Sequence, residues 1–133
     1  MARGGLLLTV GWTMRPETQT IYNLSSIEGY DAMEFDRYRR LLDRSGAAEL
    51  SRSGDMTAAS RPLLNLMGLR YIVTPPSGVV SGEDLTVAYD GPDGRVFINE
   101  QAIPRAYFVE DVVAAPGDGG HREILDRLES ADF

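Results

Sequence analysis

Cysteine and lysine are both missing from this sequence of 133 residues, and histidine occurs once. Without cysteine, the chain forms no disulfide framework, no cysteine-based zinc finger and no thiol nucleophile. The single histidine, His121, cannot build a histidine-rich metal site, and its place after two glycines is typical of an exposed residue at a helix start. We therefore expect neither a metal nor a cofactor.

Long apolar runs are missing as well. The run LLLTV near the N-terminus is far shorter than the ~20 residues that a membrane-spanning helix needs. All thirteen basic residues are arginine, and the formal net charge is −7. Because an acidic chain repels phosphate backbones, we expect no nucleic acid partner. Hydrophobic residues make up 43% of the chain and charged residues 25%, which predicts a single folded domain over residues 1–133.

The first part of the chain mixes strand and helix patterns. The apolar run at 4–12, bounded by glycines, predicts a buried strand. Pro16 and Glu17 favour a helix start, which predicts a helix over 15–26, and a brief extended stretch follows. The clearest helix is expected at 30–46, where Asp31 caps the start.

The middle of the chain predicts a sharp turn from helix to strand. Residues 47–60 are small and polar, and we expect a loop that holds at most a turn of helix. Ser60 is expected to cap a short, buried, leucine-rich helix. Gly68 should end that helix in a left-handed conformation, because only glycine adopts it without a steric penalty. The stretch LRYIVT at 69–74 then predicts a strand.

The last part of the chain is rich in strand patterns. Residues 85–100 predict a β-hairpin around DGPDG, the stretch IPRAYFVEDVV at 103–113 predicts a further strand, and residues 121–133 predict an amphipathic helix. This order favours an α+β fold, in which helices lie mainly on one face of a mixed or antiparallel sheet. A layered α/β fold is the alternative, because strand–helix–strand units are also present.

Two arginines are candidates for binding. Arg105 stands at the entry to the predicted strand at 103–113, where a buried cation needs a carboxylate or carbonyl partner. It either forms a structural salt bridge or anchors an anionic ligand or a neighbouring domain. Arg37, in the stretch DRYRR, could bind a phosphate or carboxylate, although pairs such as Asp36 with Arg40 at helical spacing favour a solvated face.

Three stretches together resemble one family. GYDAMEFDRYRRLL, LLNLMGLRYIVTP and VFINEQAIPRAYFV, in this order, are similar to the soluble extracytoplasmic segment of bacterial YfhO-type multispanning membrane proteins. The resemblance covers roughly residues 5 to 133. GYD at 29–31 and PRA at 104–106 match recurrent positions of that family, which singles out Tyr30, Asp31 and Arg105 as contact candidates beside Arg37.

The resemblance implies a place in a larger protein. The family is similar to glycosyltransferases that use polyprenyl-phosphate-linked sugars on the outer side of the membrane to glycosylate cell-envelope polymers. Its catalytic carboxylates lie near membrane helices that have no counterpart in this sequence, so no catalytic residue carries over. We therefore expect a non-catalytic domain, a fragment of a membrane protein, whose partners are the transmembrane region and a β-rich neighbour of that parent.

The competing hypothesis needs no parent protein. An independent small-ligand binding module, or a small enzyme, would hold Arg105, Arg37 or Tyr30 in a pocket. A deep pocket lined by these residues favours this hypothesis, whereas a packed interior with Arg105 paired to a carboxylate contradicts it.

Overall fold

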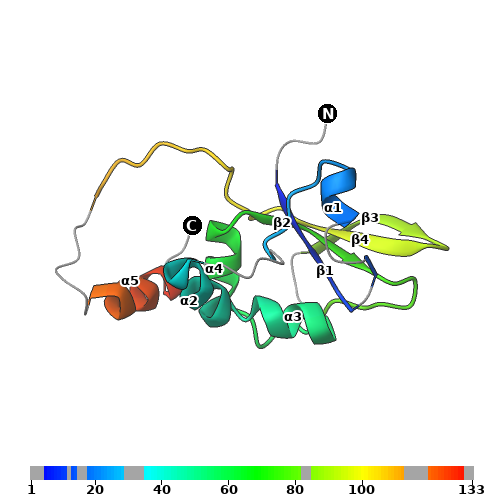
Figure 1. Ribbon diagram of the computed structural model, residues 1–133, viewed down its shortest axis with the longest axis horizontal. Helices are drawn as coiled ribbons and strands as arrows, with labels where there is room; N and C mark the ends of the chain where they lie inside the picture. The colour runs from blue at the N-terminus through cyan, green and yellow to red at the C-terminus, as the bar shows by residue number, and fades with distance from the viewer. Residues whose placement is uncertain are drawn as a thin grey trace.

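A four-stranded mixed sheet with helices packed beside it gives this chain an α+β fold, as the sequence predicts (Figure 1). The computed structural model describes residues 5–11, 13–14, 18–28, 35–81, 85–112 and 120–130. The strands are β1 (Leu6–Thr9), β2 (Leu69–Thr74), β3 (Leu85–Gly91) and β4 (Gly94–Asn99). The helices are α1 (Thr18–Ile21), α2 (Asp36–Ser45), α3 (Ala47–Ser53), α4 (Arg61–Leu66) and α5 (Gly120–Glu129).

The order of the strands in the sheet is β1-β2-β4-β3. β1 and β2 are parallel, and Leu8 pairs with Ile72. β4 is antiparallel to both of its neighbours, and Ile72 pairs with Phe97. The sheet is therefore mixed, and the layered α/β alternative, which needs a mostly parallel sheet, does not apply.

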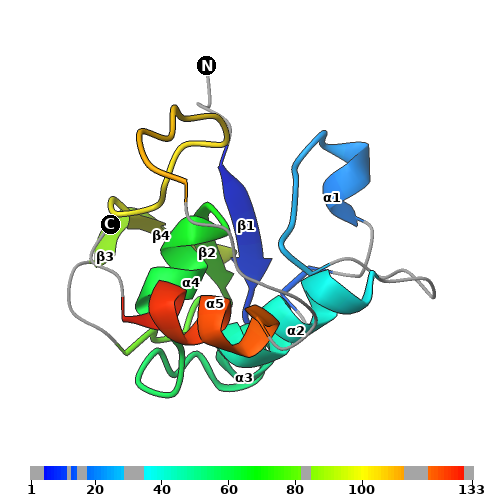
Figure 2. The ribbon, with the colours of Figure 1, turned by 90° about the vertical axis from the view of Figure 1, so that its left-hand side faces the viewer.

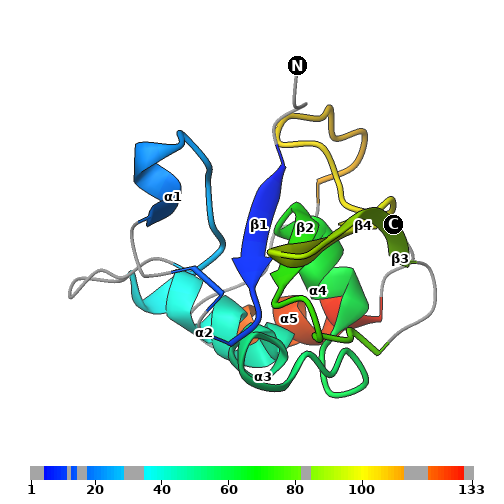
Figure 3. The same cartoon turned by 90° about the vertical axis from the view of Figure 1, so that its right-hand side faces the viewer.

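Helices α2, α3, α4 and α5 lie on one side of the sheet, and α1 stands beyond the edge that β1 forms (Figures 2 and 3). At that edge, the backbone N–H of Leu7 donates to Ser25 O at 2.9 Å, and Ile27 N–H donates to Leu7 O at 3.0 Å. These bonds tie the short extended stretch after α1 to β1. The β3–β4 hairpin projects from the end of the molecule opposite α5 (Figure 1).

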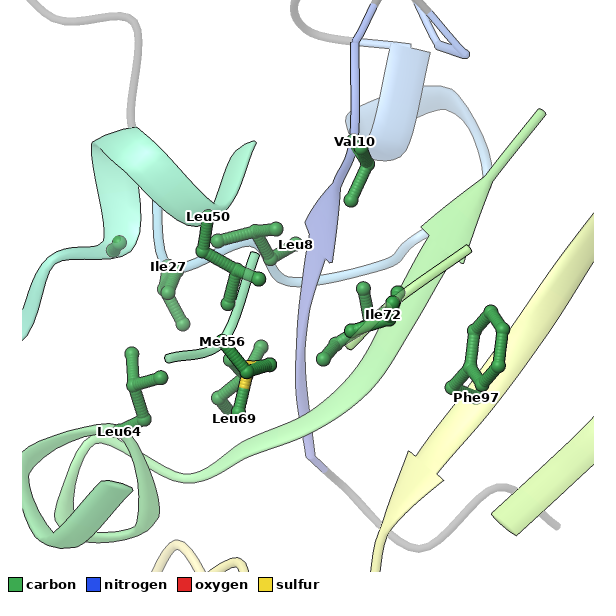
Figure 4. Packing of buried hydrophobic residues seen from close by; sticks show 11 residues of the cluster. Leu8, Val10, Ile27, Leu50, Met56, Leu64, Leu69, Ile72 and Phe97 are labelled. Carbon is green, nitrogen blue, oxygen red and sulfur yellow. The ribbon is translucent and has the colours of Figure 1, made fainter. Parts of the chain in front are cut away.

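The core lies between the sheet and the helices (Figure 4). Leu8 from β1, Ile72 from β2 and Phe97 from β4 point to the helical side, because paired residues of adjacent strands share a face. Leu50 of α3 and Leu64 of α4 pack against them, and both are completely buried. Each such leucine stabilises the fold by roughly 1.5–3 kcal/mol.

Gly46, Gly54 and Gly68 end helices in the left-handed conformation, which the sequence predicts for Gly68. Gly46 follows α2 with φ 72°, and Gly68 follows the last turn of α4 with φ 76°. Strand β2 begins at the very next residue, Leu69, so the strand turns back beside the helix that precedes it. This arrangement buries the apolar residues of α4 and β2 against each other.

Several local predictions were wrong. Residues 47–60 are not a plain loop, because α3 takes up Ala47–Ser53 between two left-handed glycines, Gly46 and Gly54. The hydroxyl of Ser60 makes no capping hydrogen bond to α4 and is buried without a partner among the described residues. The expected cap Asp31, like Pro16 and Glu17, lies outside the described residues.

Candidate functional site

A pair of buried asparagines fixes the path of the chain where it leaves β4. The side-chain amide of Asn99 donates to the side-chain oxygen of Asn65 at 2.7 Å and to Leu69 O at 2.9 Å. The backbone N–H of Gln101 donates to the Asn99 side-chain oxygen at 3.2 Å, and Ile103 N–H donates to Asn65 O at 2.9 Å. These bonds satisfy buried polar groups, and they hold the chain that follows β4 against the C-terminal end of α4.

Arg105 lies two residues further on, at a small cavity. The cavity has a volume of about 110 Å³ and a largely apolar lining. It is lined by Gly5, Leu6, Leu66, Met67, Gly68, Ile103 and Arg105. A cation beside apolar walls suits a small ligand that carries a carboxylate on a short apolar group.

The prediction that Arg105 is a buried cation at a strand entry was wrong. Arg105 is exposed, and no ion pair in the described part of the chain includes it. Its guanidinium therefore faces water and keeps its hydrogen-bond donors available for another molecule. The expected structural salt bridge is absent from the described residues.

The other candidates of the sequence do not join Arg105. Arg37 lies on α2 with an exposed side chain and is not among the residues that line the cavity. The expected pair of Asp36 with Arg40 is confirmed at 2.9 Å, which makes this face of α2 solvated. Tyr30 and Asp31 lie outside the described residues.

The exit segment, residues 104–112, contains Arg105 of this cavity and is exposed along its whole length. All nine of its residues are exposed, and they include apolar side chains at Tyr107, Phe108, Val109 and Val112. Over the described ranges the segment belongs to no strand or helix, so the predicted strand at 103–113 was wrong. The backbone N–H of Ile103 donates to Asn65 O, so at this point the chain is bonded to α4 and not to a strand of the sheet.

A half-buried carboxylate lies elsewhere, beside β1. The Ser51 hydroxyl lies 2.8 Å from Thr9 O and 3.0 Å from a carboxylate oxygen of Glu28. Burial raises the pKa of Glu28, and the hydrogen bond with Ser51 lowers it in part. The carboxyl of Asp55 shows the opposite effect, because hydrogen bonds from Thr57 and Ser81 lower its pKa.

Within the ranges that the structure describes, no group of three or more histidine, aspartate or glutamate side chains is placed to hold a metal ion. The side chain of His121 lies outside the described residues. None of the helices in these ranges has the length and apolar character that a bilayer crossing requires.

Sequence reasoning missed the two asparagines. Asn99 ends an apolar strand and Asn65 interrupts a leucine-rich helix, and a polar residue in such a place is the signal that could have revealed them. Comparisons of the chain with protein families, curated proteins and solved structures find no match.

Proposed function

We propose that this chain is a non-catalytic protein-contact domain and that the exit segment is its contact surface. The observation that carries the proposal is the run of nine exposed residues with apolar side chains at Tyr107, Phe108, Val109 and Val112. Contiguous exposed apolar surface on a folded domain marks a site of interaction with another protein. The buried Asn65–Asn99 pair holds the base of the segment in place, so the surface is presented in a defined position.

Following the family resemblance, we propose that the domain belongs to a bacterial glycosyltransferase-like membrane protein that takes part in cell-envelope polymer glycosylation. It would lie on the extracytoplasmic face of the membrane and contact the transmembrane region or a β-rich neighbour of the parent. Parts of two of the three stretches that carry the resemblance are direct partners in the fold, because GLRYIVT contains β2 and VFIN lies in β4. This pairing supports the idea that the stretches form one unit.

The first test uses the gene and the purified chain. We expect the flanking reading frame to encode membrane helices, and we expect the purified chain to turn over no polyprenyl-phosphate-linked sugar. A gene that encodes a free protein of this length without membrane helices would contradict the membrane placement. Sugar transfer by the chain alone would contradict its non-catalytic role.

The second test addresses the contact surface. A photo-crosslinking amino acid at Phe108 of the protein in its native host is expected to give adducts that peptide mapping assigns to the transmembrane region or the β-rich neighbour of the parent. Phe35 is the matched control, since it is an aromatic residue that is 86% exposed, at the start of α2. Equal adduct yields at Phe35 and Phe108 would show that exposure alone explains the adducts.

A second candidate function follows from Arg105 at the cavity of about 110 Å³. The cavity suits a small aliphatic carboxylate, with the carboxylate on Arg105 and the alkyl group against Leu6, Leu66 and Met67. Titration with butyrate, followed by amide NMR shifts, tests this function. Arg105→Gln should abolish the shifts that butyrate causes, whereas Arg37→Gln should leave them unchanged. Identical shifts in both variants exclude the site.

A further inference from the structure

We propose that the exit segment pairs in antiparallel orientation with the exit segment of a second copy of this chain, so that a two-fold symmetric dimer forms about Phe108. This inference rests on the proposed function, because it adds a second copy of the chain as a partner of the same contact surface. The second copy also provides a strand to which the backbone of the exit segment can form hydrogen bonds, a partner that the segment lacks within the described part of its own chain.

The backbone of the segment is available for pairing. No backbone hydrogen bond in the described part of the chain involves residues 104–112. Tyr107, Phe108 and Val109 belong to the residue types that favour strands, and a strand-forming sequence is stable only beside a partner strand. In all three views the described part of the segment lies on the outside of the molecule (Figures 1, 2 and 3). A second chain can therefore approach it.

The sequence of the segment is complementary to itself when it is read in opposite directions. With Phe108 on the two-fold axis, Tyr107 of one copy lies opposite Val109 of the other, and aromatic residues pair well with β-branched residues across strands. In the same register Arg105 lies opposite Asp111. Arg105 stands near one end of the segment and Asp111 near the other. The two-fold symmetry therefore brings each arginine opposite the aspartate of the other copy, which makes two ion pairs.

The two faces of such a ribbon are also consistent. Arg105, Tyr107, Val109 and Asp111 alternate onto one face, where both types of favourable pair occur. The two Phe108 side chains, one from each copy, lie beside each other on the other face. Pro104 stands at the end of the paired region, where its missing N–H costs no ladder bond.

The free edge of β3 is a poorer partner than the second exit segment. The pairing of β3 with β4 shifts register between Val87 and Tyr89, and such irregularities disfavour the addition of a strand at an edge. Pairing of an exit segment with β3 of another copy also leaves an unpaired exit segment and an unpaired β3 edge, so further copies can add. Pairing of two exit segments about a two-fold axis gives a closed dimer.

A ribbon of two strands is marginal by itself, so we expect a weak dimer that forms as concentration rises. Sedimentation equilibrium of the purified chain should show the mass increase from one copy toward two below about 1 mM, which corresponds to weak association. A chain that stays monomeric up to that concentration overturns the dimer. It leaves the proposed function intact, because the contact with a different protein does not depend on self-association.

Charge reversal gives the sharpest test. Arg105→Asp and Asp111→Arg should each abolish the dimer, because each variant places like charges opposite each other in both pairs. An equimolar mixture of the two variants should dimerise again, since every pair then joins opposite charges. Failure of the mixture to associate overturns the register. Both side chains are exposed, and circular dichroism of each variant checks that the fold is unchanged.

The absence of cysteine allows a test of the two-fold axis. Phe108→Cys places two thiols directly opposite each other, and mild oxidation should link the copies at least tenfold faster than in Val112→Cys. Equal rates would place the axis elsewhere and overturn the proposal. Phe35→Ser controls for non-specific association through exposed aromatic side chains, because it removes one that lies outside the exit segment. This variant should dimerise at the same concentrations as wild type.

Discussion

The side-chain amide of Asn99 donates a 2.7 Å hydrogen bond to the side-chain oxygen of Asn65, and both residues are buried. The bond joins the end of β4 to α4 across 34 positions of sequence. It satisfies polar groups that water cannot reach, and it stands at the base of the exit segment.

Replacement of Asn99 by alanine should therefore be costly. Asn99→Ala leaves the Asn65 side-chain oxygen and Leu69 O without their donor, which is expected to lower the free energy of unfolding by about 1–3 kcal/mol. Urea denaturation measures the change. Gln101→Ala is the control, because the exposed side chain of Gln101 only accepts a long bond of 3.4 Å from the Asn65 amide, and its loss should cost under about 0.5 kcal/mol.

Gly46→Ala should destabilise the chain more than Gly68→Ala. Both glycines have positive φ, which strains any other residue by about 1–3 kcal/mol. A Cβ at Gly46 would also lie 2.8 Å from the backbone oxygen of Ala58, whereas a Cβ at Gly68 would lie 3.4 Å from Ile103 O. Thermal melts of the two variants compare the costs, and equal melting temperatures would contradict the role of the Ala58 contact.

The stability of the Glu28→Gln variant, relative to that of wild type, should increase as pH rises. Burial raises the pKa of Glu28 above its ordinary value of 4.5, so the folded state binds its proton more tightly than the unfolded state. The stability that this gives is complete below the ordinary pKa and is lost as pH rises through the raised one. Glutamine carries no such charge.

Melting temperatures of wild type and Glu28→Gln at pH 4 and pH 7 test this prediction. The difference in melting temperature should shift in favour of the variant between pH 4 and pH 7, because wild type loses the stability that the protonated Glu28 carboxyl gives. Gln101→Glu, on an exposed residue, controls for a change of charge alone. A difference that moves toward wild type at pH 7 would mean that Ser51 outweighs burial.

Arg44 ties the last helix to the body of the protein. Its guanidinium lies 2.6 Å from Asp126 and 2.8 Å from Glu129, which raises the pKa of Arg44. Arg44→Gln should speed amide hydrogen exchange in α5, and high salt should do the same in wild type. In Arg40→Gln, which loses a pair within α2 alone, exchange in α5 should be unchanged.

Local patterns predicted much of the fold. Gly68 and the strand at 69–74 were identified because the helix end and the β-branched residues are adjacent in sequence. The hairpin was identified because its two strands flank one turn. The strand at 103–113 was predicted from the same kind of pattern, and it was wrong because a strand also needs a partner edge, which no local pattern reports.

The candidate site was less predictable. The approach of Asn65 to Asn99 depends on how α4 packs against the sheet, and the spacing of residues carries no sign of it. The sequence identified Arg105 as an important cation, but its exposure follows from the bond of Ile103 to Asn65. Helix α3 was missed because its small residues show little hydrophobic period, and flanking glycines set its ends instead.

The parallel pairing of β1 with β2 has a consequence for the folding pathway. Strands β3 and β4 are joined by a tight turn and can associate early, whereas β1 must find β2 after a long intervening stretch of chain has been ordered. Loop closure of that length makes the docking of β1 the late event. We therefore expect the rate-limiting nucleus to be centred on the hairpin and β2, and truncation of Leu8 should accelerate unfolding with little effect on the refolding rate.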